Sequence, residues 1–521
     1  MLVIGFPLLA AMQLVKCVAG LAANNCADLS QKLNISHAII HSTTQVQAGT
    51  TLTFPANRWC SRPQQVVDVN ICRVSMTVIT GPSSNISLEA WLPDNWTGRL
   101  LVVGNGGLDG CIHYEDLNYG ASTGFGTAGT NNGHDGNGES FYKNPGVVED
   151  FIYRSIHTAS SVVKEISKTF YQKGYKKSYY LGCSTGGRQA FKEAQSFPDD
   201  FDGIVAGAPA LDFNALNYWS GHFYTLTGKP GSPTFLTAAQ WDLVYADVLK
   251  QCDYLDGVLD GVLEDPQLCQ FRPESLICAP ESTENCLTGI QAATVRSVFS
   301  PVYGPEGTLV YPRLQPVANP TGLYFSGSPF TYTTEWYRYV IYNNASWEPA
   351  TLSLKDWVAA DRLNPFNAAT WEGDLSKFRQ KGGKLLHYHG LQDQVITSEN
   401  SIRYYNHVSR TMNLPSAELD QFYRFFRISG MAHCTGGAGA NFIGNSNDTA
   451  ASRDPHGNVL SAIVKWVEEG IAPETIRGTK YANGTRSSGK ILAQRDHCRY
   501  PRKNMYKGRG DANSPSSWQC M

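Results

Sequence analysis

Residues 179–191 read YYLGCSTGGRQAF. Within them, Gly182-Cys183-Ser184-Thr185-Gly186 matches G-x-S-x-G, a pattern that places a nucleophilic serine on a tight turn between a strand and a helix. The apolar residues before it predict a buried strand, and the residues after Gly186 predict a helix. Because a cysteine stands beside the serine, three interpretations are open: a serine nucleophile, a cysteine nucleophile, or a glycine turn without chemistry.

Apolar runs alternate with helical patterns on both sides of this turn. Other strands are predicted at 99–107 with a glycine turn, 124–136 with a loop, 202–210, 382–393 and 422–434, and helices at 147–171, 186–197 and about 398–410. His157, on the first of these helices, is expected in the core. Strands separated by helices indicate a mostly parallel sheet covered on both faces, which is an α/β fold.

The alternation is lost between residues 211 and 374, where Trp, Tyr, Pro and Cys are frequent. We interpret this segment as a lid domain inserted into one catalytic domain, which would comprise residues 22–210 and 375–521. A lid over the carboxyl end of the sheet would suit a binding cleft there.

A nucleophilic Ser184 needs a base, and the base needs an acid that orients it. The chain order serine, acid, histidine is typical of α/β-hydrolases. Asp393 and His433 each follow a predicted strand in this order. Asp393 could instead be a turn or cap residue and His433 a loop histidine. Other histidines that compete as the base are His387, His389 and His407.

Backbone N–H groups near Ser184 could stabilise an oxyanion. Thr185, at the start of the predicted helix, is one candidate donor. Gly106 and Gly107, in the GNGG turn at 104–107, lie where esterases place a second donor, although a plain glycine turn is the alternative.

Two cysteines flank the proposed nucleophile and base. Cys183 precedes Ser184, and Cys434 follows His433. If Ser184 and His433 touch, a Cys183–Cys434 disulfide is geometrically plausible, and a paired cysteine is not a nucleophile.

Three aspartates recur in the stretch CDYLDGVLDGVLEDPQLC, residues 252–269: Asp253, Asp256 and Asp260. Oxygen-rich loops of this kind bind Ca²⁺, although the spacing does not fit an EF-hand. Asp-Gly turns with capping carboxylates are the alternative. A bound ion would be structural, because no histidine joins the loop, and no organic cofactor is expected.

Composition and the amino terminus predict a secreted protein. Residues 1–21 resemble a signal peptide whose apolar run is too short to span a membrane. Twelve of the thirteen cysteines lie outside it, an even number that suits disulfides. The net charge of −2 gives no basic face for nucleic acid, and no membrane segment is expected. Candidate N-glycosylation sites are Asn34, Asn85, Asn95, Asn344, Asn447 and Asn483.

The segments GCSTGGRQ, HGLQDQVI and GMAHC resemble those of the fungal tannase and feruloyl esterase family, especially its feruloyl esterase B branch. GNGGLDGC, GTNNGHDG and CDYLDGVLDGVLEDP resemble further segments of that family, although Asn132 stands where glycine is expected. The likeness extends over nearly the whole chain after the leader.

The resemblance implies Ser184 as nucleophile, His433 as base and Asp393 as its orienting acid. It also implies a structural Ca²⁺ held by the three loop aspartates and by the backbone carbonyls of Val258 and Val262. The disulfides that it implies are Cys183–Cys434, Cys26–Cys72, Cys60–Cys111, Cys252–Cys269, Cys278–Cys286 and Cys498–Cys520.

The expected function is a secreted serine carboxylesterase. It would hydrolyse feruloyl and other hydroxycinnamoyl esters of plant cell-wall polysaccharides, such as feruloylated arabinoxylan or pectin, and release ferulic or a related acid. The alternatives are a tannase that hydrolyses galloyl esters and a secreted carbohydrate-binding or adhesion protein with an inactive hydrolase fold.

Overall fold

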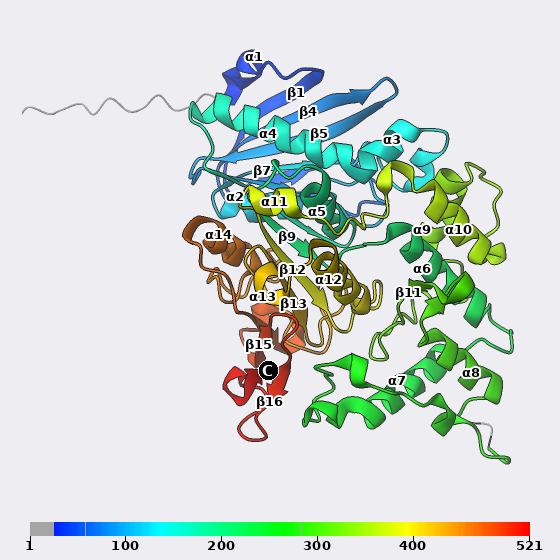
Figure 1. Cartoon of the computed structure of the whole chain (residues 1–521). Coiled ribbons are helices and arrows are strands. Elements are labelled where there is room, and N and C mark those ends of the chain that lie inside the picture. Colours follow the sequence, from blue (N-terminus) through cyan, green and yellow to red (C-terminus); the bar gives the residue numbers. More distant parts are fainter. Residues whose placement is uncertain (1–25, 58, 283) are drawn as a thin grey trace, which may run out of the picture.

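The computed structural model describes residues 26–57, 59–282 and 284–521 (Figure 1). The predicted signal peptide lies outside these residues. A nine-stranded mixed sheet forms the centre of the molecule. In spatial order its strands are β1 (Ala38–Val46), β4 (Ile71–Gly81), β5 (Ser84–Pro93), β7 (Phe125–Thr130), β6 (Arg99–Val103), β8 (Lys177–Cys183), β9 (Gly203–Gly207), β12 (Lys384–Gly390) and β13 (Tyr423–Ile428).

The six strands from β7 to β13 in this order are parallel to one another. The strands β1, β4 and β5 add an antiparallel edge. The predicted α/β fold with a mostly parallel sheet is therefore confirmed, and the antiparallel edge is an addition that the alternation of strands and helices did not reveal.

Helices cover both faces of the sheet because side chains alternate along each buried strand. On β8, Tyr180 packs into an apolar cluster with α4 (Ser155–Tyr171), α5 (Thr185–Ser196) and α12 (Ser398–Met412). Its neighbours Tyr179 and Leu181 point to the other face, where they join α2 (Tyr114–Ser122) and α14 (Val459–Glu469).

Four further short helices are α1 (Leu29–Lys32), α3 (Pro145–Glu149), α11 (Ser376–Gln380) and α13 (Ser416–Leu419). The helix predicted at 147–171 is observed as α3, a π-helical turn at Asp150–Arg154, and α4.

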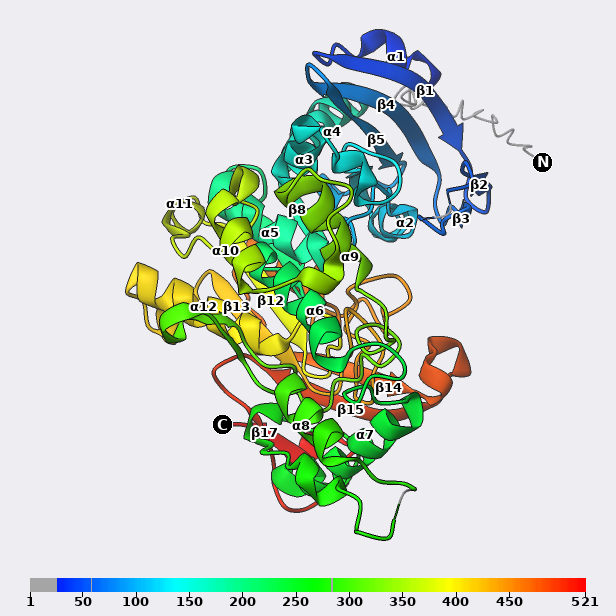
Figure 2. The same ribbon diagram turned by 90° about the vertical axis from the view of Figure 1, so that its right-hand side faces the viewer.

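The segment between β9 and β12 lies beside the end of the sheet, and its regular elements are mostly helices (Figures 1 and 2). Trp219, Trp241 and Trp336 are fully buried in an apolar cluster formed mainly by this segment. Its role as a separate lid domain stays a prediction. The elements between β9 and β12, α11 aside, are α6 (Phe213–Thr227), α7 (Ala238–Cys252), α8 (Gly289–Val298), β10 (Val302–Tyr303), β11 (Leu309–Tyr311), α9 (Thr331–Glu335) and α10 (Leu354–Leu363).

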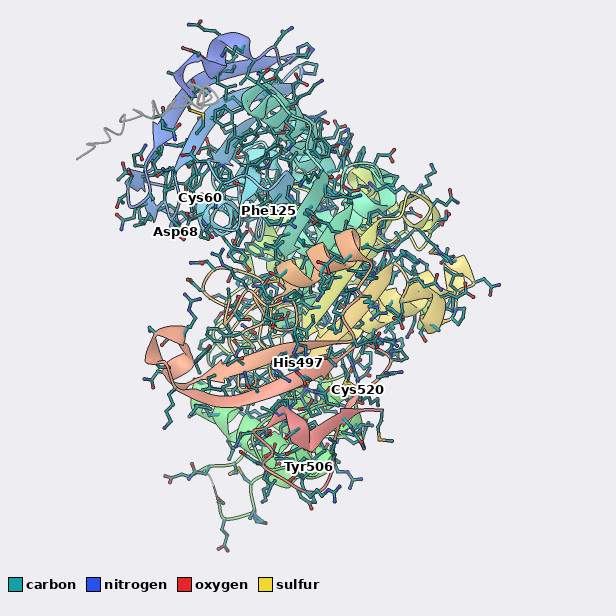
Figure 3. The ribbon with its side chains drawn as sticks, turned by 90° about the vertical axis from the view of Figure 1, so that its left-hand side faces the viewer. Cys60, Asp68, Phe125, His497, Tyr506 and Cys520 are labelled. Carbon is teal, nitrogen blue, oxygen red and sulfur yellow. A yellow bond between two sulfur atoms is a disulfide. The ribbon has the colours of Figure 1, made fainter. Side chains whose placement is uncertain are left out.

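Small antiparallel ribbons complete the fold. A carboxyl-terminal ribbon lies against β13, and Figure 3 labels His497 on it with Cys520 and Tyr506 on the strands beside it. No helix among the described residues has the length and apolar character needed to cross a membrane. The ribbon strands are β2 (Thr51–Thr53), β3 (Gln64–Val66), β14 (Thr475–Tyr481), β15 (Ile491–Cys498), β16 (Asn504–Tyr506) and β17 (Trp518–Cys520).

All six expected disulfides are present in the described part of the chain. Five of them close loops of 8 to 51 residues, whereas Cys183–Cys434 links residues 251 apart. This long-range bond joins the end of β8 to the loop that follows β13, and the segment between β9 and β12 lies between its two cysteines in the chain.

Candidate active site

Ser184 lies on a sharp turn between β8 and α5. Its backbone has φ 65° and ψ −121°, and its N–H donates to the Gly207 carbonyl over 3.0 Å. A Cβ atom on Gly182 would lie 2.7 Å from the Gly186 backbone, and one on Gly187 would lie 2.1 Å from the Gly207 oxygen. The glycines of the motif are therefore needed because strand, turn and helix pass too close for a side chain.

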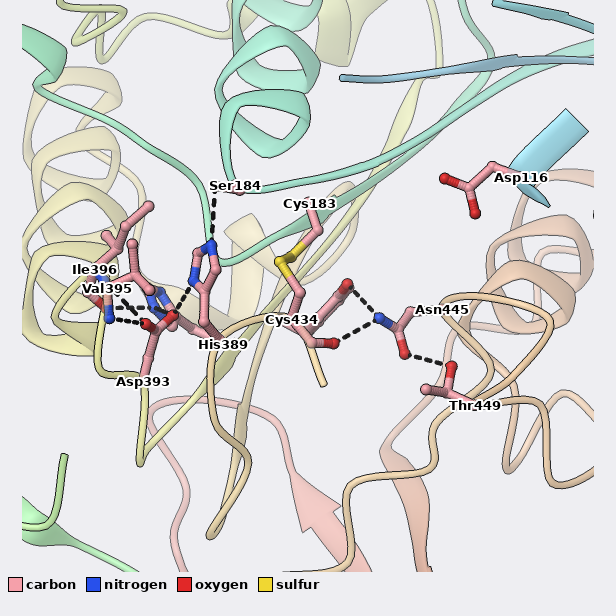
Figure 4. The surroundings of a disulfide bond; sticks show 12 residues. Asp116, Cys183, Ser184, His389, Asp393, Val395, Ile396, Cys434, Asn445 and Thr449 are labelled. Carbon is pink, nitrogen blue, oxygen red and sulfur yellow. Dashed lines mark hydrogen bonds and ion pairs between the residues drawn. A yellow bond between two sulfur atoms is a disulfide. The ribbon is translucent and has the colours of Figure 1, made fainter. Parts of the chain in front are cut away.

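Three side chains from the ends of three parallel strands meet at this turn (Figure 4). Nε2 of His433 lies 2.9 Å from Oγ of Ser184, and Nδ1 of His433 lies 2.8 Å from Oδ2 of Asp393. The structure thus brings the three predicted residues into one hydrogen-bonded chain. In this arrangement the imidazole can accept the serine proton while the carboxylate holds the ring in place.

Asp393 is fully buried, yet its surroundings favour the ionised form. Oδ1 accepts hydrogen bonds from the backbone N–H groups of Val395 and Ile396, at 2.8 and 2.9 Å. Burial alone would raise the pKa of Asp393. The neighbouring His433 and the hydrogen bonds from His389 and His433 outweigh burial and hold the pKa below its usual range.

The hydrogen-bonded chain continues beyond Asp393. Because a carboxylate only accepts, Nε2 of His389 donates to Oδ2 of Asp393 over 3.0 Å. Oγ of Ser401 lies 2.6 Å from Nδ1 of His389 and 2.9 Å from Nε2 of His387, whose Nδ1 lies 2.9 Å from the Tyr423 hydroxyl. Every group is satisfied when Tyr423 donates to His387, His387 to Ser401, and Ser401 to His389.

The competing histidines are therefore not alternative bases. His387 and His389 are fully buried behind Asp393, and His407 bonds the Trp371 carbonyl through Nε2. Sequence reasoning missed their supporting position. The i, i+2 spacing of His387 and His389 on one strand was the available signal, since it puts both rings on the same face of the sheet.

The Cys183–Cys434 disulfide lies directly beside Ser184 and His433 (Figure 4). Its Cα atoms are 6.0 Å apart. Asn445 holds the loop from the other side by donating to the Cys434 carbonyl over 2.8 Å and to the Tyr388 hydroxyl over 2.9 Å. Cys183 is therefore not a free thiol, and it does not compete with Ser184 as a nucleophile.

The expected oxyanion donors lie at different places around Ser184. Thr185 is the first residue of α5, so its backbone N–H has no acceptor within the helix. Its hydroxyl donates to the Gly107 carbonyl over 2.6 Å, and Gly107 lines the pocket beside Ser184. A Cβ atom on Gly106 would lie 3.5 Å from Oδ2 of Asp109. The donor roles of Thr185, Gly106 and Gly107 stay predictions.

A mostly apolar pocket opens at Ser184. Part of its wall comes from α6 and part from the residues before and within α9, so residues between β9 and β12 contribute to the site. The lining residues are Gly107, Leu108, Ser184, Thr185, Ala210, Phe213, Leu216, Asn217, Ser220, Tyr324, Phe330, Tyr332, Val395 and Ile396.

Most polar groups of this wall already have partners. The Tyr324 hydroxyl donates to the Val395 carbonyl over 2.7 Å and lies 3.1 Å from Oγ of Ser220. Nδ2 of Asn217 donates to the Phe213 carbonyl over 2.9 Å. Tyr332 remains 40% exposed at the wall. The pocket therefore suits a flat apolar group that carries few hydroxyls.

The aspartate loop is held by its own backbone. Asp253 accepts from the N–H of Gly261, Asp256 from that of Val258, and Asp260 from that of Val262, each at 3.0–3.1 Å. Burial, together with the neighbouring carboxylates of Asp260 and Asp253, raises the pKa of Asp256 to about 6. The Cys252–Cys269 disulfide closes this loop.

The donor set of the loop fits a hard cation such as Ca²⁺. Three carboxylates crowd one short segment, and the nearest counter-charge is Arg495, 3.5 Å from Asp260. The loop aspartates are not among the described residues whose ligand atoms lie within 4.8 Å of one another. An ion would therefore have to draw the carboxylates together, against the hydrogen bonds that now hold them apart.

The candidate glycosylation sites are accessible. Asn34, Asn85, Asn95, Asn344 and Asn483 are exposed, and Asn447 is partly exposed. Their positions would admit a glycan, which stays a prediction.

Comparison with known proteins identifies the family. The family model described as "Tannase and feruloyl esterase" matches residues 69–337 and 328–521. The chain is 52% identical over 501 residues to "Probable feruloyl esterase B-2" of Aspergillus oryzae, covering 95% of each. It superimposes on the crystal structure of feruloyl esterase B from Aspergillus oryzae with a TM-score of 0.93 and 48% identity, covering 95% of this chain and 99% of that one.

A more distant structure shares the fold alone. Tannin acyl hydrolase from Aspergillus niger is 21% identical, with a TM-score of 0.73 over 96% of this chain and 95% of its own. The family model and the close relatives together cover nearly the whole described chain. The chain belongs to the tannase and feruloyl esterase family.

Proposed function

We propose that this chain is a secreted serine carboxylesterase that hydrolyses feruloyl and related hydroxycinnamoyl esters of plant cell-wall polysaccharides, such as feruloylated arabinoxylan or pectin. The observation that carries the proposal is the chain Ser184–His433–Asp393 at the wall of a mostly apolar pocket. The relatives named feruloyl esterase B support the substrate class.

Hydrolysis would proceed in two steps. Oγ of Ser184 attacks the ester carbonyl while Nε2 of His433 takes its proton and then passes it to the leaving sugar hydroxyl. Asp393 stabilises the imidazolium that forms between these transfers. The Thr185 N–H, with Gly107 or Gly106 as the second donor, stabilises the oxyanion. Water activated by His433 then cleaves the acyl-enzyme and releases ferulic acid.

The pocket wall favours a hydroxycinnamoyl group over a galloyl group. A galloyl ring brings three hydroxyls, and each would lose water on entry and need a new partner. Asn217, Ser220 and Tyr324 already use hydrogen bonds within the protein. A feruloyl ring buries one hydroxyl and one methoxy group, which this wall accommodates more easily.

Ser184→Ala tests the chemistry. We expect it to abolish hydrolysis of methyl ferulate, caffeate, p-coumarate and gallate, with an unchanged melting temperature. Hydrolysis that persisted in the variant would exclude Ser184 as the nucleophile. A wild-type protein that hydrolysed none of these esters would favour the inactive carbohydrate-binding alternative.

The ratio of kcat/KM values on the four esters tests the substrate. We expect methyl ferulate, caffeate or p-coumarate to exceed methyl gallate by at least about tenfold, the effect of leaving one buried hydroxyl unpaired. A preference for gallate would identify a tannase instead.

We also propose that the loop of Asp253, Asp256 and Asp260, with the carbonyls of Val258 and Val262, binds a structural Ca²⁺. The ion would supply charge neutralisation where three carboxylates crowd together. Millimolar Ca²⁺ should raise the melting temperature of the chelator-treated protein, and Asp256→Asn should reduce this rise. Asp242→Asn, at an exposed position of α7, is the matched control. An equal rise in Asp256→Asn would contradict the site.

Secretion and glycosylation belong to the same proposal. Six disulfides and six accessible Asn-x-Ser/Thr sites support an oxidising, extracellular setting. Expression of the full chain in a fungal host, followed by peptide mapping of the culture medium, tests both the leader cleavage and the glycans.

A further inference from the structure

Three potential metal ligands converge at the other end of α5 from Ser184. His157 of α4, Glu193 of α5 and Asp200 in the turn before β9 bring one ligand atom each within 4.8 Å of one another. Among the described residues, this is the only group of three or more His, Cys, Asp or Glu side chains whose ligand atoms lie that close together. They come from three separate elements, so the cluster exists only in the folded chain.

Glu193 is the least satisfied member of the cluster. It is 1% exposed, and neither of its carboxylate oxygens accepts a hydrogen bond from an N–H or hydroxyl group of the described residues. Its neighbour is the Asp200 carboxyl, to which it can bond only by sharing a proton. A buried carboxylate without a partner is strongly disfavoured, so a proton or a cation must neutralise it.

The nearby lysines do not neutralise Glu193 by direct contact. Nζ of Lys192 donates to the carbonyls of Phe366 and Asn367. Nζ of Lys164 donates to the Asp200 carbonyl over 2.7 Å and lies 4.0 Å from Oδ1 of Asp200. One lysine thus offsets Asp200 in part, and neither lysine bonds to the Glu193 carboxylate.

His157 opens the cluster to solvent. The sequence placed it in the core, which is wrong: its side chain is 40% exposed. The ring stacks on Phe197 at 4.1 Å, and Nδ1 lies 2.6 Å from Oδ2 of Asp200. The helical pattern could not reveal that this position lies at the border of the packed face. An ion could therefore reach Glu193 past the His157 ring.

We propose that His157, Glu193 and Asp200 form a site for a divalent transition-metal ion of the Zn²⁺ type, distinct from the aspartate loop. One imidazole and two carboxylates are a donor set that Zn²⁺ accepts, with water completing the shell. Metal–ligand distances of about 2.0–2.2 Å put ligand atoms roughly 3.4 Å apart in a tetrahedral shell. The His157–Asp200 hydrogen bond would open to admit the ion.

The ion would fasten α4 to the end of α5 and to the entry of β9. Its role would be structural, because the cluster lies at the end of α5 opposite to Ser184. Because the ion would bind the folded chain and not the unfolded one, it would stabilise the folded chain. Binding would also release protons from the cluster, so affinity should increase with pH.

The test is Zn²⁺ binding by the full chain, measured by calorimetry and by melting temperature, with millimolar Ca²⁺ present throughout to occupy the aspartate loop. We expect binding of one Zn²⁺ to the wild type, weakened at least about tenfold in both Glu193→Gln and His157→Ala. His41→Ala removes an exposed histidine of β1 and is the matched control, with binding unchanged.

A shared proton is the competing explanation of Glu193. Burial raises the pKa of this carboxyl well above its usual range, and the charge of Asp200, together with a hydrogen bond to its carboxyl, raises it further. Glu193→Gln mimics the protonated form. Wild-type protein that binds no Zn²⁺, or Zn²⁺ binding that is equally tight in Glu193→Gln, would overturn the metal site. If Glu193→Gln does not fold, His157→Ala, at a partly exposed position, provides the same test: Zn²⁺ binding as tight as in the wild type would overturn the metal site.

Discussion

At the scale of single residues, Asp393 is the fixed charge on which the site depends. Asp393→Asn removes that charge and can present an amide N–H to Nδ1 of His433, which would favour the wrong tautomer. We expect kcat on methyl ferulate to fall about 10³–10⁴-fold with a small change in KM.

The control for this substitution is Asp374→Asn, a partner of the Ser376 N–H at an exposed position. Its kcat should equal that of the wild type. An Asp393→Asn variant that keeps its melting transition and has a kcat near that of the wild type would contradict the electrostatic role.

Ser401 links two buried histidines behind Asp393. Ser401→Ala leaves Nδ1 of His389 and Nε2 of His387 without their shared partner, which should cost about 1–3 kcal/mol of unfolding free energy for each unpaired group. His389 would also orient Asp393 less firmly. We therefore expect kcat to fall several-fold while KM stays unchanged, as measured by steady-state kinetics.

Two variants separate positioning from general destabilisation. Ser401→Thr keeps a hydroxyl and should recover most of kcat. Ser409→Ala, on the same helix, removes a hydroxyl that bonds the Leu414 carbonyl and should leave kcat unchanged. If Ser401→Ala lowered stability and left kcat intact, the chain beyond Asp393 would support folding alone.

At the scale of elements, the sequence predicted the parallel half of the sheet and the residues at its carboxyl edge. Ser184, Asp393 and His433 could be assigned because parallel strands end at one edge, and each residue follows a predicted strand. The hydrogen bonds of His387 and His389 could not, because they depend on how α12 packs against β12.

The antiparallel edge was left unpredicted although part of its signal is visible. On β4, the buried Val74, Met76 and Val78 alternate with less buried residues, which is the period of a strand. The partner of such a strand is not encoded locally. The helices α6 to α10 were also missed, because their aromatic residues pack into a core of their own rather than against the sheet.

His497 on β15 makes this carboxyl-terminal ribbon sensitive to pH. Nδ1 accepts from the Ser429 N–H and Nε2 donates to the Ala440 carbonyl, so the ring must stay neutral. Burial lowers its pKa to about 4. Between pH 4 and 6.5 the unfolded chain therefore binds more protons, and the stability that this ring contributes is lost as the pH falls through that window.

His497→Gln removes this titration. We expect the difference in unfolding free energy between wild type and variant to be largest above pH 6.5 and to shrink by up to about 3 kcal/mol at pH 4. Urea unfolding at pH 4, 5, 6 and 7 measures it. His41→Gln controls for the loss of one histidine. A difference that did not vary with pH would contradict the neutral ring.

At the scale of the whole molecule, one covalent bond joins the two halves of the site. The Cys183–Cys434 disulfide closes a loop of 251 residues, including the segment between β9 and β12. By chain entropy such a loop contributes about 5 kcal/mol, against about 2–3 kcal/mol for the loop of 8 residues closed by Cys278–Cys286. The same bond fixes the spacing of Ser184 and His433, which a distant disulfide cannot do.

The two effects can be measured separately in paired variants. Replacing both Cys183 and Cys434 with alanine should lower the melting temperature more than replacing both Cys278 and Cys286, and it alone should lower kcat. Some activity should remain, because Asn445 still holds the Cys434 loop and Gln394 still accepts from the His433 N–H. Equal losses of melting temperature would contradict stabilisation by loop length, and an unchanged kcat in the first variant would contradict positioning of the base. A larger loss of melting temperature together with a lower kcat would show that this one bond contributes both to the stability of the chain and to the geometry of its site.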